Sequence, residues 1–205
     1  MSEDIQELGK VKLVQVQPSG LIIETSSGYF YDVTRRVEVE KLVITPLGIE
    51  ATTPAGEHVL DIHHMNHPDK KYGDDDLVSI GFTSHYKAMS ERFGEHMEDG
   101  TAGENIIIES DQEVWMDDFG QQIAIDNTET GSKALLDVLR FAPPCEEFSH
   151  FVAKSQHEKL PEEELKDILQ FLNKGRRGFL LVLSKGQEEA TVQAGDRVFA
   201  IRGKE

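Results

Sequence analysis

Residues 175–201 read GRRGFLLVLSKGQEEATVQAGDRVFAI, and this stretch decides the fold class. Three short runs within it, 179–183, 190–192 and 197–201, are rich in branched and aromatic residues and are separated by turns that contain glycine. Runs of this kind are typical of β-strands joined by short connections. The stretch therefore predicts a β-meander that closes a sheet near the end of the chain.

Strand-like segments also fill the rest of the chain. They lie at 12–16, 21–25, 29–31, 37–45, 105–108, 114–115 and 122–125, and turn-forming residues separate the first three. Residues 46–56 hold two prolines and two glycines and are expected to form a loop. Many short strands with few helices indicate a mainly β fold, a β-barrel with helical insertions. The strands between 11 and 45 are expected to belong to the same barrel.

Two helices are expected. The first spans 84–93, with Ser84 as its N-cap and Gly94 after its end. The second spans 161–172, where a proline opens the first turn and three glutamates follow at the positive end of the helix dipole. Its buried stripe is formed by Leu165, Ile168, Leu169 and Leu172.

Length and charge limit the possible functions. The chain has 205 residues, which fits one domain over 1–205. Acidic residues outnumber basic ones 38 to 21, for a net charge of −17, which opposes binding to nucleic acid or to an anionic membrane. One cysteine excludes an internal disulfide, no segment resembles a secretion signal or a membrane span, and a cytoplasmic location is expected.

The single cysteine, Cys145, follows two prolines and lies five residues after Arg140. Proline fixes φ and biases the residue before it towards extended backbone, so the thiol is held in a rigid turn. A lone cysteine is ordinarily a small buried apolar residue. The nearby arginine favours a reactive thiolate instead, whereas the carboxylates of Glu146 and Glu147 oppose it. Both interpretations of Cys145 stay open on local sequence.

A group of metal-capable side chains lies between residues 58 and 67, and it consists of His58, Asp61, His63, His64 and His67. Imidazole and carboxylate groups are suitable ligands for zinc or iron. This group gives one alternative function, a metal-dependent hydrolase. The other interpretation is a polar loop whose histidines line a groove or bond the backbone.

Basic residues stand out against the acidic background, at Arg35-Arg36, Lys70-Lys71, Arg140 and Arg176-Arg177. The turn 175–178 combines two guanidinium groups with glycines, a combination that suits a phosphate or a carboxylate. It gives a second alternative, a non-catalytic barrel that binds an anionic small molecule. Glu104 and Asn105 follow a glycine at a strand start and are further polar candidates.

Taken in order, several of these segments resemble the MOSC family, named after the C-terminal domain of molybdenum cofactor sulfurase. The matching segments are His67-Pro-Asp-Lys70, His85-Tyr86, Phe93-Gly94 with Ala102-Gly-Glu-Asn-Ile106, Arg140 to Cys145, Gly175-Arg-Arg-Gly-Phe179 and Val192-Gln-Ala-Gly-Asp196. They are similar to the family's Gly-Pro-Asp-Lys, His-Tyr, Phe-Gly-Glu-Asn-Leu, Pro-Arg-x-Pro-Cys, Gly-Arg-x-Gly-Trp/Tyr and terminal strand motifs. Residues 95–101 form an insertion within the third motif, and Arg140 lies one residue further from the cysteine than is usual in the family.

The resemblance implies a MOSC-type β-barrel and a functional role for Cys145. In this family the cysteine carries sulfur as a persulfide, received from a cysteine desulfurase that uses pyridoxal phosphate, or its thiolate ligates molybdenum in the molybdenum cofactor (molybdopterin). The resemblance further implies that Arg140, Arg176, Arg177, Lys70, His67, Glu104 and Asn105 bind the anionic pterin or orient the sulfur. A molybdenum-dependent oxidoreductase or a sulfur transferase is thus expected, and redox chemistry would need an external electron donor.

Overall fold

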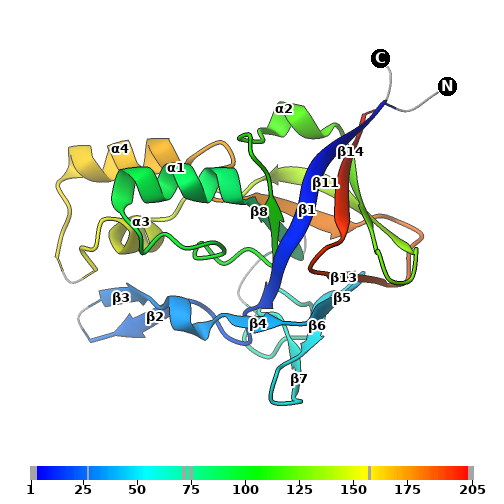
Figure 1. Ribbon diagram of the computed structural model, residues 1–205. Helices are drawn as coiled ribbons and strands as arrows, with labels where there is room; N and C mark the ends of the chain where they lie inside the picture. The colour runs from blue at the N-terminus through cyan, green and yellow to red at the C-terminus, as the bar shows by residue number, and fades with distance from the viewer. Residues whose placement is uncertain (1–3, 27, 71–72, 74–75, 157, 203–205) are drawn as a thin grey trace.

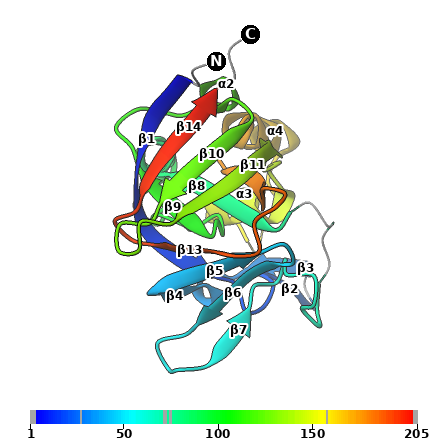
Figure 2. The ribbon, with the colours of Figure 1, turned by 90° about the vertical axis from the view of Figure 1, so that its right-hand side faces the viewer.

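The computed structural model describes residues 4–26, 28–70, 73, 76–156 and 158–202. Seven strands close into a β-barrel in the order β14-β10-β11-β12-β8-β9-β1, and β14 pairs back onto β1 (Figures 1 and 2). The barrel strands are β1 (Asp4–Val16), β8 (Val78–Phe82), β9 (Ile106–Glu109), β10 (Gln122–Asp126), β11 (Lys133–Phe141), β12 (Phe179–Leu183) and β14 (Arg197–Arg202). Neighbouring strands are antiparallel except β8 and β9, which are parallel. The mainly β fold class is confirmed.

A second, four-stranded sheet lies against the barrel in the order β13-β5-β6-β7 (Figure 2). Its strands are β13 (Ala190–Gln193), β5 (Lys41–Thr45), β6 (Gly48–Thr52) and β7 (His58–Leu60). The strands β2 (Ile22–Thr25) and β3 (Gly28–Tyr31) form a separate hairpin, and β4 (Val37–Val39) extends the barrel sheet by pairing with β1. The short 3-10 helix η1 (Val33–Arg35) joins β3 to β4.

Three sequence expectations about strands are wrong. The last three strands do not form a meander, because β12 and β14 lie in the barrel while β13 pairs with β5 and buries Val192 beside Leu42. The segment 37–45 divides at Glu40 between the two sheets. The strands between 11 and 45 are therefore not all part of the barrel, since β2, β3 and β5 lie outside it. Pairing partners far along the chain decide these placements, and local propensity does not reveal them.

Two segments have a different structure from the expected one. Residues 46–56 contain the strand β6, because Gly48 (φ 124°) allows a tight turn that brings the chain back along β5. Residues 114–115 are not a strand. They lead into the helix α2 (Met116–Phe119), where the backbone amide of Trp115 donates to the Asp118 carboxylate at 2.7 Å.

The longer helices, α1 (Thr83–Phe93), α3 (Glu146–Val152) and α4 (Glu162–Leu172), lie together on one side of the barrel, and the hairpin β2-β3 packs against α3 (Figure 1). Both expected helices are confirmed. The N-cap of α1 is Phe82 and not Ser84, which is itself buried in the first turn. No helix among the described residues is long and apolar enough to cross a membrane.

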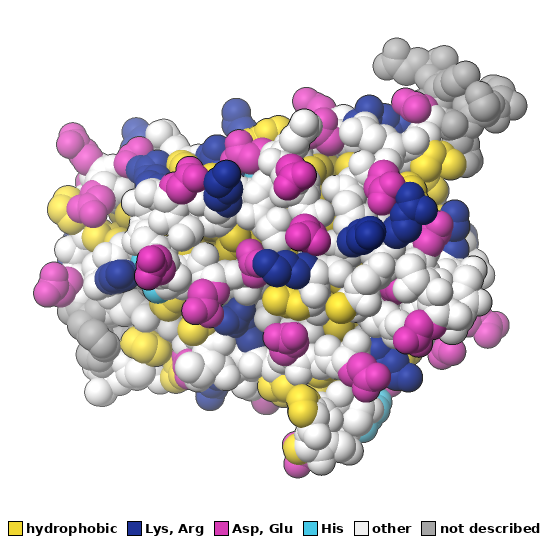
Figure 3. Space-filling model, in the orientation of Figure 1, with side chains coloured by type: hydrophobic (Ala, Val, Ile, Leu, Met, Phe, Trp, Pro, Cys, Tyr) yellow, Lys and Arg dark blue, Asp and Glu magenta, His cyan; other side chains and the backbone are white. Residues whose placement is uncertain are grey.

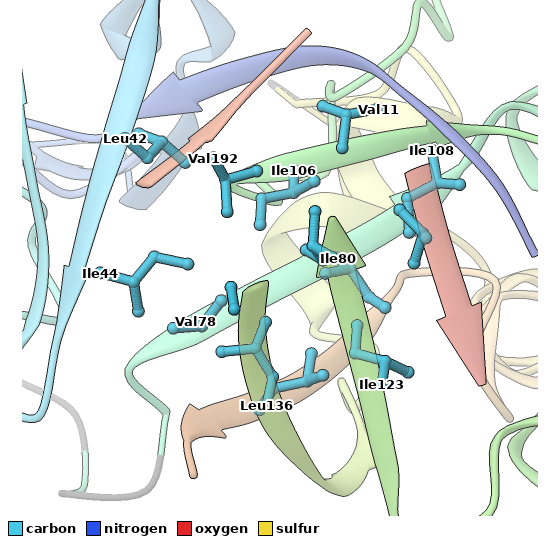
Figure 4. Packing of buried hydrophobic residues seen from close by; sticks show 14 of the residues in the cluster. Val11, Leu42, Ile44, Val78, Ile80, Ile106, Ile108, Ile123, Leu136 and Val192 are labelled. Carbon is cyan, nitrogen blue, oxygen red and sulfur yellow. The ribbon is translucent and has the colours of Figure 1, made fainter. Parts of the chain in front are cut away.

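The apolar core has two parts. The first fills the barrel and continues under the second sheet, so that side chains from β8, β9, β10 and β11 point towards Leu42, Ile44 and Val192 (Figure 4). The second part lies between the helices and the hairpin and includes Tyr31, Met89, Phe148 and Leu172. Burial of each such side chain contributes about 1.5–3 kcal/mol. This second core fixes the helices and the hairpin around the mouth of the barrel.

Candidate functional site

A cavity of about 180 Å³ opens where one end of the barrel meets the hairpin β2-β3. Its wall comes from the end of β1, from the starts of β8 and β12, from the loop before β9 and from the segment after β11. The lining residues are Gln17, Leu21, Ile22, Tyr31, His63, Asp76, Ser79, Ala102, Gly103, Glu104, Ala142, Pro143, Arg177 and Leu180. Residues distant in sequence therefore converge on one polar opening.

Glu104 is the buried acid of this cavity, with 2% of its surface exposed. The Tyr86 hydroxyl on α1 donates to Glu104 Oε2 at 2.5 Å and accepts the Ala102 backbone N–H at 2.9 Å. Among the described residues, no donor bonds Glu104 Oε1. Burial raises the pKa of Glu104 to about 7, although the Tyr86 hydrogen bond and the positive charge of Arg177 act to lower it. The side chain thus changes its charge near neutral pH.

Two glycines make the space for the Glu104 carboxyl group. A Cβ atom on Gly81 would lie 2.6 Å from Glu104 Oε1. A Cβ atom on Gly178 would lie 2.8 Å from Glu104 Cγ and 2.5 Å from the Ile80 carbonyl oxygen. Glycine, the smallest residue, therefore occupies one position on β8 and the position directly before β12. The Glu104 carboxyl group packs against both positions. The buried acid is therefore built into the packing of the barrel.

The substitution Gly178→Ala is expected to destabilise the protein by about 3 kcal/mol or more. Gly178 has a φ of 97°, which strains any residue with a Cβ, and the new methyl group would also overlap Glu104 and the Ile80 backbone. Denaturant unfolding would measure the loss. Gly186→Ala is a matched control, because Gly186 has a φ of 98° with nothing within 4 Å. Equal losses in the two variants would contradict the packing role of Gly178.

Arg177 joins the cavity to the cysteine turn. Its Nη1 donates to the Pro143 carbonyl oxygen at 2.6 Å, and its guanidinium carbon lies 5.4 Å from the centre of the Phe148 ring. Pro143 and Phe148 flank Cys145 in sequence. The glycines at 175 and 178 both have positive φ, which shapes the turn that presents the arginine. The cavity wall therefore carries a cation that also fixes the backbone beside the thiol.

Cys145 is half-buried at the N-cap of α3, and its side chain makes no capping hydrogen bond. Its carbonyl oxygen accepts from Ser149, through the backbone amide at 3.1 Å and the hydroxyl at 2.8 Å. Cys145 packs at the edge of the second core and is not itself in the cavity wall. Burial raises the pKa of the Tyr31 hydroxyl group. The positive charge of Arg177 lowers this pKa, whereas negative charge on Glu104 or Cys145 raises it further. The thiol and the cavity acid therefore both lie within electrostatic reach of one phenol.

The other predicted cations have different positions. Arg176 does not line the cavity, and its guanidinium group lies over the rings of Phe171 (4.2 Å) and Trp115 (5.1 Å). Arg140 forms an ion pair with Asp76, which does line the cavity. His67 Nε2 lies 3.1 Å from the Pro18 carbonyl oxygen, and Lys70 contacts the sulfur of Met65. Neither His67 nor Lys70 lines the cavity, and Lys71 is outside the described residues.

Asn105 has a structural role beneath the cavity. Its Oδ1 accepts from the backbone and side chain of Ser79 at 3.1 and 2.8 Å, and its Nδ2 donates to Asp61 Oδ2 at 2.8 Å. Asp61 is fully buried and also accepts from the Gln17 amide and from His63, whose Nδ1 lies 2.8 Å from Asp61 Oδ1. These contacts tie β1, β8 and the segment after β7 together. Asn105, expected as a cofactor-binding residue, does not reach the cavity wall.

The predicted metal ligands do not come together. His58 is exposed and pairs with Glu50 at 3.0 Å, while the ring of His64 is buried with its Nε2 3.5 Å from the same carboxylate. Asp61 and His63 form the separate pair described above. In the described part of the chain, no three His, Cys, Asp or Glu side chains are grouped so as to hold a metal ion. The hydrolase alternative therefore has no support from this geometry.

Four polar lining residues were not singled out as site residues from sequence: Gln17, Tyr31, Asp76 and Ser79. Asp76 is the last acid of the run 74–76, and the partner of Arg140. No local pattern marks Tyr31 or Ser79, since the hairpin and β8 meet only in the fold.

This chain is thus a small β-barrel protein whose cysteine turn lies beside a cavity that contains a buried acid and an arginine. A family model of the MOSC domain matches residues 67–199, so the chain belongs to the MOSC domain family. A comparison with curated proteins finds no match.

Solved structures agree with this fold. The YUAD protein from Bacillus subtilis is 12% identical with a TM-score of 0.61, covering 99% of this chain and 100% of that one. YiiM from Escherichia coli is 16% identical with a TM-score of 0.53, covering 96% of this chain and 71% of that one. At these identities the likeness concerns the fold alone.

Proposed function

We propose that this MOSC protein uses the Cys145 thiolate in metal-sulfur cofactor chemistry, either carrying a persulfide sulfur or ligating the molybdenum of molybdenum cofactor. The observation that carries the proposal is the hydrogen bond from Arg177 Nη1 to the Pro143 carbonyl oxygen at 2.6 Å. It places a cation of the cavity wall beside the turn that holds the only thiol. Thiolate sulfur is a strong nucleophile and a soft metal ligand, so one residue suits both uses.

The cavity fits an anionic, sulfur-bearing group of limited size. Its volume of about 180 Å³ is below the roughly 300–1,000 Å³ of usual small-molecule pockets, and the terminal group of a cofactor fits this space better than a whole pterin does. Arg177 would pair with the negative charge, and Cys145, two residues after the wall residue Pro143, would supply the soft ligand from beside the cavity. Bound molybdenum cofactor would supply two-electron redox chemistry, for which an external electron donor is needed.

Acidic residues dominate the charge of the chain, 38 against 21 basic ones. Asp and Glu side chains are scattered over the face seen in Figure 3, with Lys and Arg between them. The net charge of −17 repels anions at long range. An anion that enters must therefore be held by local contacts, and Arg177 provides a positive charge in the cavity wall.

In the sulfur-carrier use, Cys145 receives its sulfur atom by exchange with a persulfide. The Cys145 thiolate attacks the outer sulfur of a persulfide on a cysteine desulfurase, an S–S bond forms to Cys145, and the S–S bond of the donor breaks. The electron pair of the broken bond stays with the donor sulfur, which leaves as a thiolate. No external oxidant or reductant is consumed, because the sulfane sulfur only changes its carrier.

Native mass spectrometry of the purified protein tests the proposal, before and after incubation with a desulfurase, its pyridoxal phosphate and cysteine. We expect one added sulfur that maps to Cys145, or a bound pterin with molybdenum. Dithiothreitol should remove the added sulfur and leave a bound pterin in place, which separates the two uses. A protein that acquires neither sulfur nor cofactor under these conditions contradicts the proposal.

A further inference from the structure

Glu104 lines the cavity, and its Oε1 is a buried polar atom to which the described residues give no hydrogen-bond partner. The other carboxyl oxygen is fixed by Tyr86 at 2.5 Å. Buried polar atoms are rarely left without a partner, and each exception calls for an explanation. Glu104 itself lines the cavity, so its carboxyl group borders a space that a ligand can enter. A ligand in the cavity would complete the bonding of Oε1.

The charges around Glu104 indicate what kind of ligand this is. Arg177 lies in the same wall, and its positive charge acts to lower the pKa of Glu104. The charge of Arg36, in the segment before β4, acts on this pKa in the same direction. Tyr86 on α1 and Tyr31 on β3 are neutral phenols whose pKa values burial raises. The remaining titratable groups of the wall are His63, paired with Asp61, and Asp76, paired with Arg140. Arginine attracts an anion, but an ionised Glu104 in the same wall would repel it.

The geometry points to a proton-coupled anion site, in which Arg177 pairs with a small tetrahedral oxo- or thio-anion and Glu104 donates a hydrogen bond to the same anion from a protonated Oε1. Such an anion is the end group of a sulfur donor or the phosphate of a pterin cofactor. The inference rests on the proposed function for the source of the anion, while the binding itself can be measured without Cys145.

A protonated carboxyl group suits this position on two grounds. Tyr86 already donates to Oε2, so the proton belongs on Oε1, the oxygen without a partner. Burial raises the pKa of Glu104 to about 7, and the neutral acid is thus accessible at neutral pH. Above that pH, each bound anion should take up a proton from solution, and affinity should fall about tenfold per pH unit.

Isothermal titration calorimetry with thiosulfate, in the Cys145→Ser background, tests the inference between pH 6 and 9. Two buffers of different ionisation enthalpy should reveal uptake of about one proton per anion at pH 8. A parallel titration with inorganic phosphate separates the two sources, because tighter thiosulfate binding indicates a sulfur donor and tighter phosphate binding a pterin phosphate. A failure of sulfur loading at Cys145 would leave this result unaffected.

Glu104→Gln provides the decisive comparison. The amide keeps the shape of the acid, can accept from Tyr86 through its oxygen, and donates to the anion at any pH. This variant should bind thiosulfate at pH 8.5 at least tenfold more tightly than the parent, without proton uptake. Glu109→Gln, at an exposed position on β9, is the matched control and should behave as the parent.

Tyr86→Phe gives a second, independent test. The hydrogen bond from Tyr86 stabilises the ionised form of Glu104, so its loss should raise the pKa of Glu104. The fall in anion affinity should therefore move to higher pH. His63→Gln should leave the midpoint in place, which excludes His63 as the group that titrates. The inference is overturned if the parent binds neither anion at any pH, or if Glu104→Gln keeps the pH dependence of the parent.

Discussion

Cys145→Ser is expected to abolish sulfur loading by a cysteine desulfurase and to leave the protein at least as stable as the parent. A serine hydroxyl is not ionised at neutral pH and forms no persulfide. Serine is, however, a preferred N-cap residue, and Cys145 holds the N-cap of α3 without a side-chain hydrogen bond. A gain of up to about 1 kcal/mol is therefore expected from capping. Mass spectrometry after loading and denaturant unfolding would measure the two effects.

The separation of these two effects makes the result interpretable. Loss of loading with full stability assigns the function to the thiol, whereas joint loss would indicate a damaged fold. Cys145→Ala serves as the control, because alanine removes the thiol without offering a cap and should lose loading to the same extent. Sulfur uptake by Cys145→Ser at the level of the parent would contradict the proposed role of Cys145.

Asp61→Ala is expected to lower the free energy of unfolding by about 3–5 kcal/mol at neutral pH. The buried carboxylate accepts from the backbone amides of Gln17 and His63 and from the side chain of Asn105, at 2.8 to 3.0 Å. Without the carboxylate, these donors would lose their partner in a site closed to water. Asp111→Ala, at an exposed position, is the control and should change stability by less than about 0.5 kcal/mol.

The effect of Asp61 should also depend on pH. Burial acts to raise the pKa of Asp61, but the hydrogen bonds from His63 and Gln17 and the charge of His63 outweigh burial, and the net pKa is lowered. Because the folded-state pKa lies below the unfolded value of about 3.9, this stabilisation is present above that pH and is lost as the pH falls through the folded-state pKa. Unfolding curves between pH 2 and 7 should show the parent approaching the variant in acid. A difference that stays constant down to pH 2 would contradict this account.

The sequence predicts the type of most strands but not their partners. The run 179–183 becomes β12 because its branched residues suit a buried strand. The run 190–192 becomes β13, yet nothing within it indicates that its partner is β5, more than a hundred residues earlier. The partners depend on which strands can be brought together to bury Leu42 and Val192, and that is a property of the whole chain.

The site was predicted in part. Sequence reasoning named Glu104 and Arg177, and both line the cavity. It gave Arg176 the same role, but adjacent residues of a turn point in different directions, and Arg176 stacks on aromatic rings instead. Likewise, in the pair His85-Tyr86, Tyr86 bonds the cavity acid, while His85 is buried beside Trp115 with its pKa lowered by burial to about 4.

The pairing of β1 with β14 has a consequence for how the protein is made. Each strand of that pair comes from one end of the described chain, and β14 also covers the outer edge of β10. During translation, β1 and β10 therefore leave the ribosome with open edges that stay unpaired until the last strand has been synthesised. Open strand edges are templates for aggregation. A nascent chain stalled before residue 197 should consequently depend on chaperones far more than the finished protein does.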